Sequence, residues 1–277
     1  MFTFAVVGRD ESERLATAIG QARAAAHDAD EIWFVDSGSV DGSPELAASL
    51  GARVVEAPSG KGRAIARALR EVTTEYVVLL DADIDRPTPN IPLALRKVVE
   101  RTGADLVVAE FDEPKMQLRH TTRYVWGPLV ARLFPEAHQR FGCTPLSGFR
   151  ALRAGQDLGR IPPGFAVEAH INLAVAAAGG AVELAEVGAY WGPVRPKTRL
   201  GSEVGAAVLD HAERLGRLDS EMRPRWDRWV EAIVLIVVEG PPAAGDAASP
   251  SNLAEPGYVA RLEAAVSRPL PPARAAA

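Results

Sequence analysis

Two aspartates separated by one residue, Asp81 and Asp83, follow directly after the apolar segment YVVLL. Carboxylate oxygens are the ligands that Mg²⁺ and Mn²⁺ prefer, and two carboxylates at a strand end can share one such ion. A divalent ion held there could bridge to a diphosphate and neutralise the charge that develops as the diphosphate leaves. The alternative is an ordinary turn, in which aspartate is common. The spacing makes Asp81 and Asp83 candidate metal ligands.

Two further polar segments could act on the same ligand. The segment DSGSVDGS begins with Asp36 and Ser37 and could offer a carboxylate and hydroxyls to a base or a ribose. The segment SGKG places Lys61 at the predicted start of a helix, where anions are favoured and lysine adds a point charge for phosphate. Each segment also has a structural interpretation. Asp41 or Ser43 could cap the next helix, and Lys61 could be a solvated loop residue.

The elements that must position these residues alternate between strands and helices. We predict strands at residues 2–7, 31–35, 53–56, 76–80 and 105–109, and helices at residues 12–27, 44–50, 62–72 and 92–99. This alternation is typical of a parallel, doubly wound α/β sheet, in which ligands bind beyond the carboxyl ends of the strands. Polar residues 8–10, 36–39 and 81–83 each follow a strand, so we expect them at one edge of the sheet.

From about residue 121 the chain is more helical. Helices are predicted at residues 124–134, 167–178, 203–218, 226–238 and 258–265, and a strand at residues 181–189. Residues 240–252, GPPAAGDAASPSN, have the composition of a linker, and the tail is expected to be disordered. We therefore divide the chain into residues 1–115 and 116–239, two halves of one domain, and a partly disordered linker and tail at residues 240–277.

Composition excludes several classes of protein. The chain has 277 residues, 47% of them hydrophobic, and can bury a substantial core. Its formal net charge of -5 argues against nucleic acid as a partner. The lone Cys143 excludes an intrachain disulfide and fits a reducing cytoplasm. We expect a cytoplasmic protein, because the start does not read as a signal peptide and no apolar run approaches the ~20 residues of a membrane span.

The order of these segments resembles the GT-A glycosyltransferases, and most closely the group of glucosyl-3-phosphoglycerate synthase and mannosylglycerate synthase. The motifs that carry the resemblance are IWFVDSGSVDGS, SGKGRAIARAL and YVVLLDADI, followed by TRYVWGPLVARLFP, TPLSGFR and GFAVEAHINL. The resemblance covers most of the chain, from residue 2 to about residue 199. It implies a GT-A, Rossmann-like α/β fold with a mostly parallel sheet and a helical C-terminal part.

The resemblance also implies roles for individual residues. Asp83, Glu168 and Lys61 would be catalytic, and Asp83 and Asp81 would hold Mg²⁺ or Mn²⁺. The residues that would bind the nucleotide sugar in the 1–115 half and the loops nearby are Val7, Gly8, Asp10, Asp36, Ser37, Lys61, Asp81, Ala82, Ser147, Gly148 and Glu168. The acceptor, in the 116–239 half, would be held by Arg119, His120, Thr122 and Arg195. The family also suggests a homodimer.

One position departs from the family pattern. The family supplies a histidine as a further metal ligand a few residues before an Arg-Pro pair. If Arg195-Pro196 is that pair, Gly192 stands at the histidine position and Val194 at that of a polar residue on the acceptor side. Metal binding would then be weaker, or be completed by water or another group.

Three functions remain open at this point. The first is transfer of a hexose from a UDP- or GDP-sugar to a small polar acceptor, such as a glycerate-type or other anionic metabolite, with retention implied by the resemblance. An inverting enzyme would need a carboxylate base, for which the sequence offers Glu168. The second is a nucleotidyltransferase acting on a sugar phosphate, although the segment GRDE after the first strand is not a glycine-rich phosphate loop. The third is a non-catalytic protein that binds sugar nucleotides.

Overall fold

The computed structural model describes residues 1–84, 90–112, 120–189, 197–239 and 256–273. Contacts divide the chain into two compact units. The first comprises Met1–Lys115 and Gln139–Arg195, and the second comprises Met116–His138 and Pro196–Ala277. The boundary is therefore not a single cut near residue 115, because the chain returns to the first unit after residue 138. The functional division into a donor half and an acceptor half stays a prediction.

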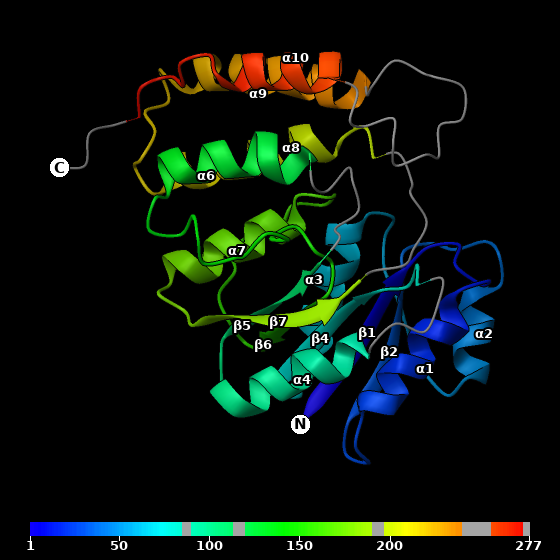
Figure 1. The fold of residues 1–277 in the computed structure, drawn as a ribbon. Coiled ribbons are helices and arrows are strands. Elements are labelled where there is room, and N and C mark those ends of the chain that lie inside the picture. The colour runs from blue at the N-terminus through cyan, green and yellow to red at the C-terminus, as the bar shows by residue number, and fades with distance from the viewer. Residues whose placement is uncertain (85–89, 113–119, 190–196, 240–255, 274–277) are drawn as a thin grey trace. The chain divides into compact units, whose positions relative to one another are not determined.

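Seven strands form one sheet in the first unit (Figure 1). They are β1 (Phe2–Gly8), β2 (Glu31–Asp36), β3 (Arg53–Glu56), β4 (Tyr76–Asp81), β5 (Leu106–Phe111), β6 (Arg150–Arg153) and β7 (Val182–Gly188). Their order across the sheet is β3-β2-β1-β4-β6-β5-β7. β1 lies parallel to both β2 and β4, whereas β6 runs antiparallel between β4 and β5. The mostly parallel α/β sheet that the sequence predicts is confirmed.

Helices pack against both faces of this sheet. They are α1 (Leu15–Ala25), α2 (Ser43–Ser49), α3 (Lys61–Glu71), α4 (Ile91–Thr102) and α7 (Val167–Ala177). α1 contacts α2 and α4, and their apolar side chains share one core with Phe4, Phe34 and Val78 of the strands. α3 contacts α7 and β1 and buries its own apolar stripe. Residues on both faces of the strands are buried, because helices cover both sides of the sheet. The strands are therefore continuous apolar segments in the sequence.

Strand register brings the predicted polar segments to one edge. Gly8 of β1 pairs with Asp36 of β2, and Val7 pairs with Asp81 of β4. Adjacent parallel strands therefore end at the same level, and the loops that follow β1, β2 and β4 leave the sheet side by side. The expected convergence at the carboxyl edge is confirmed.

Strand β6 is an element that the sequence pattern does not reveal. Its four residues, RALR, begin and end with arginine and show no alternation of apolar and polar residues. It forms because β4 and β5 each offer it an antiparallel partner, with Val78 pairing with Ala151 and Leu106 with Leu152. Pairing on both sides outweighs the weak local preference.

The second unit consists of helices. A π-helical turn η1 (Thr122–Trp126) leads into α6 (Gly127–Leu133), and the later helices are α8 (Leu200–Arg214), α9 (Arg223–Glu239) and α10 (Pro256–Val266). α8 packs closely on α9, because Gly201 and Gly205 leave room for Val234 and Val230. No helix within the described residues is long and apolar enough to cross a membrane.

Candidate functional site

Three charged side chains meet at the carboxyl end of β4. The ammonium of Lys61, the first residue of α3, lies 2.7 Å from Oδ1 of Asp81 and 2.6 Å from Oε1 of Glu168. Asp81 ends β4, and Glu168 lies in the first turn of α7. Their side chains are 15%, 20% and 5% exposed, respectively. We call these three residues the Lys61 cluster.

The side chain of Lys61 stays positively charged. Burial alone would lower the pKa of Lys61, but the charges and hydrogen bonds of Asp81 and Glu168 outweigh it and raise the pKa above its usual value. The side chain is therefore a cation at any pH at which the protein would be assayed. A cation between two carboxylates at the ligand edge of a sheet is placed to meet an anion that displaces one of them.

The glycines beside Lys61 serve packing rather than an open ligand path. A Cβ on Gly62 would overlap the carbonyl oxygen of Pro162, and one on Gly60 would lie 2.6 Å from that of Pro163. The backbone N–H of Gly62 donates to Gly164 O at 3.1 Å, and that of Arg63 donates to Pro163 O at 3.3 Å. Two amides at the start of α3 are thus occupied by protein carbonyls, so the charge offered to an anion here is that of Lys61 itself.

Arg150, at the start of β6, is a residue that sequence reasoning missed. It is 1% exposed. Its guanidinium donates to carbonyl oxygens of Pro145, Ser147 and Glu168 and to Oδ1 of Asn172. Burial lowers the pKa of Arg150 to about 10, against the opposing effect of Glu168 and Asp81, so it remains charged at neutral pH. The signal in the sequence is an arginine inside the apolar stretch LSGFRAL.

Arg150 fixes the loop that covers Asp81. Ser147, in that loop, is buried, and its hydroxyl accepts from Phe149 N–H at 3.2 Å. Gly148 lies so close to Asp81 that a Cβ there would overlap the carboxylate. Only glycine allows this approach. Arg150 thereby joins the loop around Gly148 to the start of α7, where Glu168 lies.

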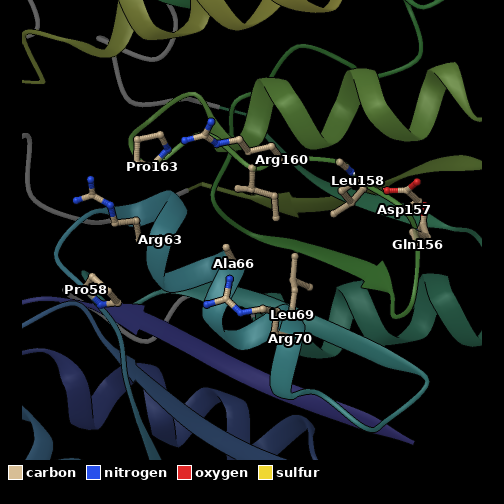
Figure 2. Close-up of a pocket in the computed structure, with 12 residues that line it drawn as sticks. Pro58, Arg63, Ala66, Leu69, Arg70, Gln156, Asp157, Leu158, Arg160 and Pro163 are labelled. Carbon is tan, nitrogen blue, oxygen red and sulfur yellow. Dashed lines mark hydrogen bonds between the residues drawn. The ribbon is translucent and has the colours of Figure 1, made fainter.

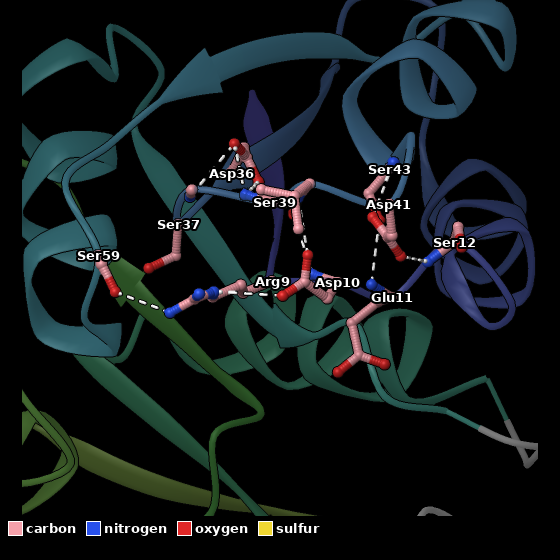
Figure 3. A network of polar contacts seen from close by, with 12 residues as sticks. Arg9, Asp10, Glu11, Ser12, Asp36, Ser37, Ser39, Asp41, Ser43 and Ser59 are labelled. Carbon is pink, nitrogen blue, oxygen red and sulfur yellow. Dashed lines mark hydrogen bonds and ion pairs between the residues drawn. The ribbon is translucent and has the colours of Figure 1, made fainter.

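The loops after β1 and β2 form a separate polar network (Figure 3). Asp36 accepts hydrogen bonds from Gly38 N–H, Ser39 N–H and the Ser39 hydroxyl. Asp10, whose φ of 54° lies in the left-handed region, accepts from Val40 N–H, and its own N–H donates to the Ser39 hydroxyl. We call the residues of this network the β1–β2 loop network.

Ser37 connects the two loops to α3. Its hydroxyl accepts from Gly60 N–H at 2.9 Å and keeps its own proton free to donate. Val7 and Gly8 end β1 beneath it, and a Cβ on Gly8 would lie 2.6 Å from the Cβ of Ala82. The predicted donor residues of the first unit are thus brought to one edge, although the carboxylate of Asp36 is engaged within its own loop.

The carboxylates at this edge are of the type that holds a divalent ion. Asp83 lies two residues beyond the end of β4 and is half-buried. Within the described residues, no three His, Cys, Asp or Glu side chains come together as a metal site. The pair Asp81 and Asp83 therefore supplies at most a partial set of oxygen ligands from this part of the chain. Gly192 and Val194 lie outside the described residues.

Two of the predicted acceptor residues, His120 and Thr122, are among the described residues, and both belong to the second unit. His120 Nδ1 lies 3.3 Å from the hydroxyl of Tyr258, and its ring meets that of Tyr124 edge-on. Thr122 begins η1. Arg119 and Arg195 lie outside the described residues. The contact between His120 and α10 is one that the sequence does not predict.

The mostly parallel sheet, with Asp81 at the end of its central strand beside Lys61, has the architecture of the GT-A class of sugar-nucleotide transferases. Residues 4–152, more than half of the chain, match the model of the family described as "Glycosyl transferase family 2". The chain belongs to this family.

Individual relatives agree with this assignment. A glucosyl-3-phosphoglycerate synthase of Mycobacterium tuberculosis is 33% identical over an alignment of 164 positions, and the match covers 50% of this chain and 49% of that protein. The chain thus matches about half the length of this curated relative. A solved structure of that organism's synthase, in complex with Mn²⁺, uridine-diphosphate-glucose and phosphoglyceric acid, has a TM-score of 0.67 at 25% identity and covers 79% of this chain and 81% of its own.

A second solved structure also resembles this chain. The mannosyl-3-phosphoglycerate synthase from Rubrobacter xylanophilus has a TM-score of 0.70 at 25% identity, covering 79% of this chain and 76% of its own. The likeness to glucosyl-3-phosphoglycerate synthases that the motifs predict is confirmed.

Proposed function

We propose that this chain transfers a hexose from a nucleotide-diphosphate sugar, linked to UDP or GDP, to a small anionic acceptor such as a glycerate or its phosphate ester. The observation that carries the proposal is the Lys61 cluster at the carboxyl end of β4. The M. tuberculosis synthase whose structure holds UDP-glucose and phosphoglyceric acid supports a UDP-sugar donor and a phosphorylated acceptor.

The proposed chemistry uses the charges at the site. The acceptor hydroxyl attacks the anomeric carbon, the bond from that carbon to the phosphate oxygen breaks, and the departing phosphate takes the hydroxyl proton, with retention of configuration. Lys61 stabilises the negative charge that develops on the leaving diphosphate. Glu168 accepts hydrogen bonds from hydroxyls of the donor sugar. A bound Mg²⁺ or Mn²⁺, held by Asp83 and Asp81, supplies further Lewis-acid stabilisation of that charge.

The remaining parts of the proposal concern the acceptor and the assembly. We assign the acidic group of the acceptor to His120 and Thr122, together with Arg119 and Arg195. We also expect a homodimer located in the cytoplasm, which light scattering and fractionation of cells would test.

Thermal shift with a panel of nucleotide sugars tests the donor site. A ligand that binds only the folded state raises the Tm by mass action. We expect one UDP- or GDP-sugar to raise the Tm in the presence of Mn²⁺, and Asp83→Ala to abolish the rise. Asp28→Ala is the matched control, since Asp28 is exposed in the turn before β2 and should leave the rise unchanged.

Other outcomes separate the competing functions. No rise with any nucleotide sugar contradicts the proposal. A rise without turnover of any acceptor indicates a non-catalytic binding protein, and release of pyrophosphate from a nucleoside triphosphate and a sugar phosphate indicates a nucleotidyltransferase. Once an acceptor that the protein glycosylates is found, NMR of the product shows its anomeric configuration. A product with inverted configuration refutes the proposed retention.

A further inference from the structure

A groove of about 610 Å³ lies in the first unit, between α3 and the loop that precedes α7 (Figure 2). Three arginines line it: Arg63 and Arg70 from α3, and Arg160 from the loop. The size is within the range of small-molecule sites, roughly 300–1,000 Å³. Among the described residues that line the groove, none belongs to the Lys61 cluster.

The lining of this groove carries a net positive charge, since three arginines and one acid, Asp157, contribute to it. The side chains of Arg70 and Arg160 make no hydrogen bond or ion pair with any described residue, and the side chain of Arg63 donates only to the carbonyl of Ser59 at 2.8 Å among them. The acid that lines the groove, Asp157, accepts from Gly159 N–H at 2.9 Å. A group of guanidinium ions with so little counter-charge attracts anions.

A neighbour on the same helix shows that this is not a general property of α3. Arg67 lies 2.5 Å from Glu71 and forms an ion pair with it. Arg67 does not line the groove, whereas Arg63 and Arg70, on either side of it in sequence, do. The arginines that face the groove are therefore the ones without a carboxylate partner.

The rest of the lining suits the carbon part of a small ligand. Leu69 of α3 and Leu158 and Ile161 of the loop provide apolar surface between the arginines. The loop itself is held in place, because Leu158 O is bonded to the buried His170 ring at 2.8 Å and the Gln156 amide donates to Asp105 O at 2.8 Å. A preformed wall reduces the ordering cost of binding.

We propose that this groove binds a small phosphate ester, with the guanidinium groups holding the phosphate and the apolar surface holding the carbon skeleton. Guanidinium groups match phosphate in geometry and form paired hydrogen bonds with it. A ligand in the groove would contact a residue next to the Lys61 cluster, since Pro163 lines the groove and also packs against Gly60. Binding there does not require that the chain transfer a sugar.

The test is titration calorimetry at constant ionic strength with two probes, inorganic phosphate and a phosphorylated hexose. We expect the double variant Arg70→Gln/Arg160→Gln to bind about tenfold more weakly for each guanidinium lost, or more. Arg67→Gln removes one guanidinium from α3 outside the groove and should bind as the wild type does. Circular dichroism and the Tm establish that each variant is folded.

A second control separates this groove from the donor site. Lys61→Gln should retain binding of both probes if they occupy the groove. The proposal is overturned if the wild type binds neither probe at millimolar concentration, if Arg67→Gln weakens binding as much as the double variant, or if Lys61→Gln abolishes binding while the double variant keeps it. Failure to turn over any nucleotide sugar would leave these results unchanged, so the two proposals fail separately.

Discussion

The Lys61 cluster and the β1–β2 loop network both place aspartates just beyond parallel strands, yet they satisfy those aspartates differently. Asp81 is paired with the side-chain cation of Lys61 and lies beneath the Gly148 loop. Asp36 accepts from backbone N–H groups and a hydroxyl of its own loop. Asp10 accepts from Val40 N–H of the neighbouring loop and forms an exposed ion pair with Arg9. Asp36 is buried and Asp10 is exposed, so the partners of the carboxylates, and not burial alone, distinguish the two arrangements.

This difference separates residues that can respond to a ligand from residues that build the loops. A carboxylate that accepts hydrogen bonds from backbone N–H groups fixes a turn, and the turn would unfold if those hydrogen bonds were lost. A carboxylate paired with a lysine can be replaced when an anion binds, because the lysine then has another acceptor for its hydrogen bonds. We therefore expect substitutions near the Lys61 cluster to cost the most.

The largest effect is expected for Arg150→Met, which removes the buried cation behind the cluster. Carbonyl oxygens of Pro145, Ser147 and Glu168 would each lose a donor in a buried site, although Pro145 O would keep the Asn172 amide as a donor. We expect a loss of about 4 kcal/mol in the free energy of unfolding, measured by urea denaturation. Arg101→Met, an exposed position on α4, is the control. Equal stability of the two variants would show that Arg150 does not organise this region.

The next effect is expected for Lys61→Gln, which leaves Asp81 and Glu168 facing each other without a cation. We expect a loss of about 3 kcal/mol in the free energy of unfolding, as for a broken buried ion pair, and loss of the Tm rise with nucleotide sugars. Lys97→Gln, on the exposed side of α4, should change neither. A fully stable Lys61→Gln variant would mean that Asp81 and Glu168 do not depend on this cation.

The smallest effect is expected for Asp41→Asn, next to the β1–β2 loop network, where the Asp41 carboxylate accepts from Ser12 N–H at 2.9 Å and from the Ser43 hydroxyl at 2.6 Å. Burial alone would raise the pKa of Asp41, but hydrogen bonds from Ser43 and Ser12 outweigh it and lower the pKa below its usual value. A carboxyl whose folded-state pKa is lowered stabilises the fold above its unfolded pKa, near 4, and this contribution is lost as the pH falls towards the folded value.

Because Asp41 is exposed, the expected difference between wild type and Asp41→Asn is about 0.5–1 kcal/mol at neutral pH. Unfolding at a series of pH values should show it shrinking below about pH 4. Asp28→Asn should show no comparable difference. A difference that stays constant with pH would refute the role assigned to the ionised carboxylate.

The sequence by itself determined the alternation of strands and helices and the level at which the strands end. Period and composition are local properties, so β1, β2 and β4 and the polar residues after them could be read from the chain. For the same reason the amino-acid sequence alone was enough to assign Asp81 and Ser37 to one edge of the sheet and Lys61 to the start of a helix. The motif GFAVE indicated Glu168 only through its likeness to a family.

Only the tertiary structure decided what those residues contact. Lys61 meets Glu168 because the backbone of Pro162 and Pro163 packs against the glycines at the start of α3. Arg150 is buried because β6 inserts between β4 and β5. The groove arginines line one groove for a similar reason, since α3 and the loop before α7 come together only in the fold. Contacts between segments distant in the chain depend on which surfaces pack, and no local pattern records that choice.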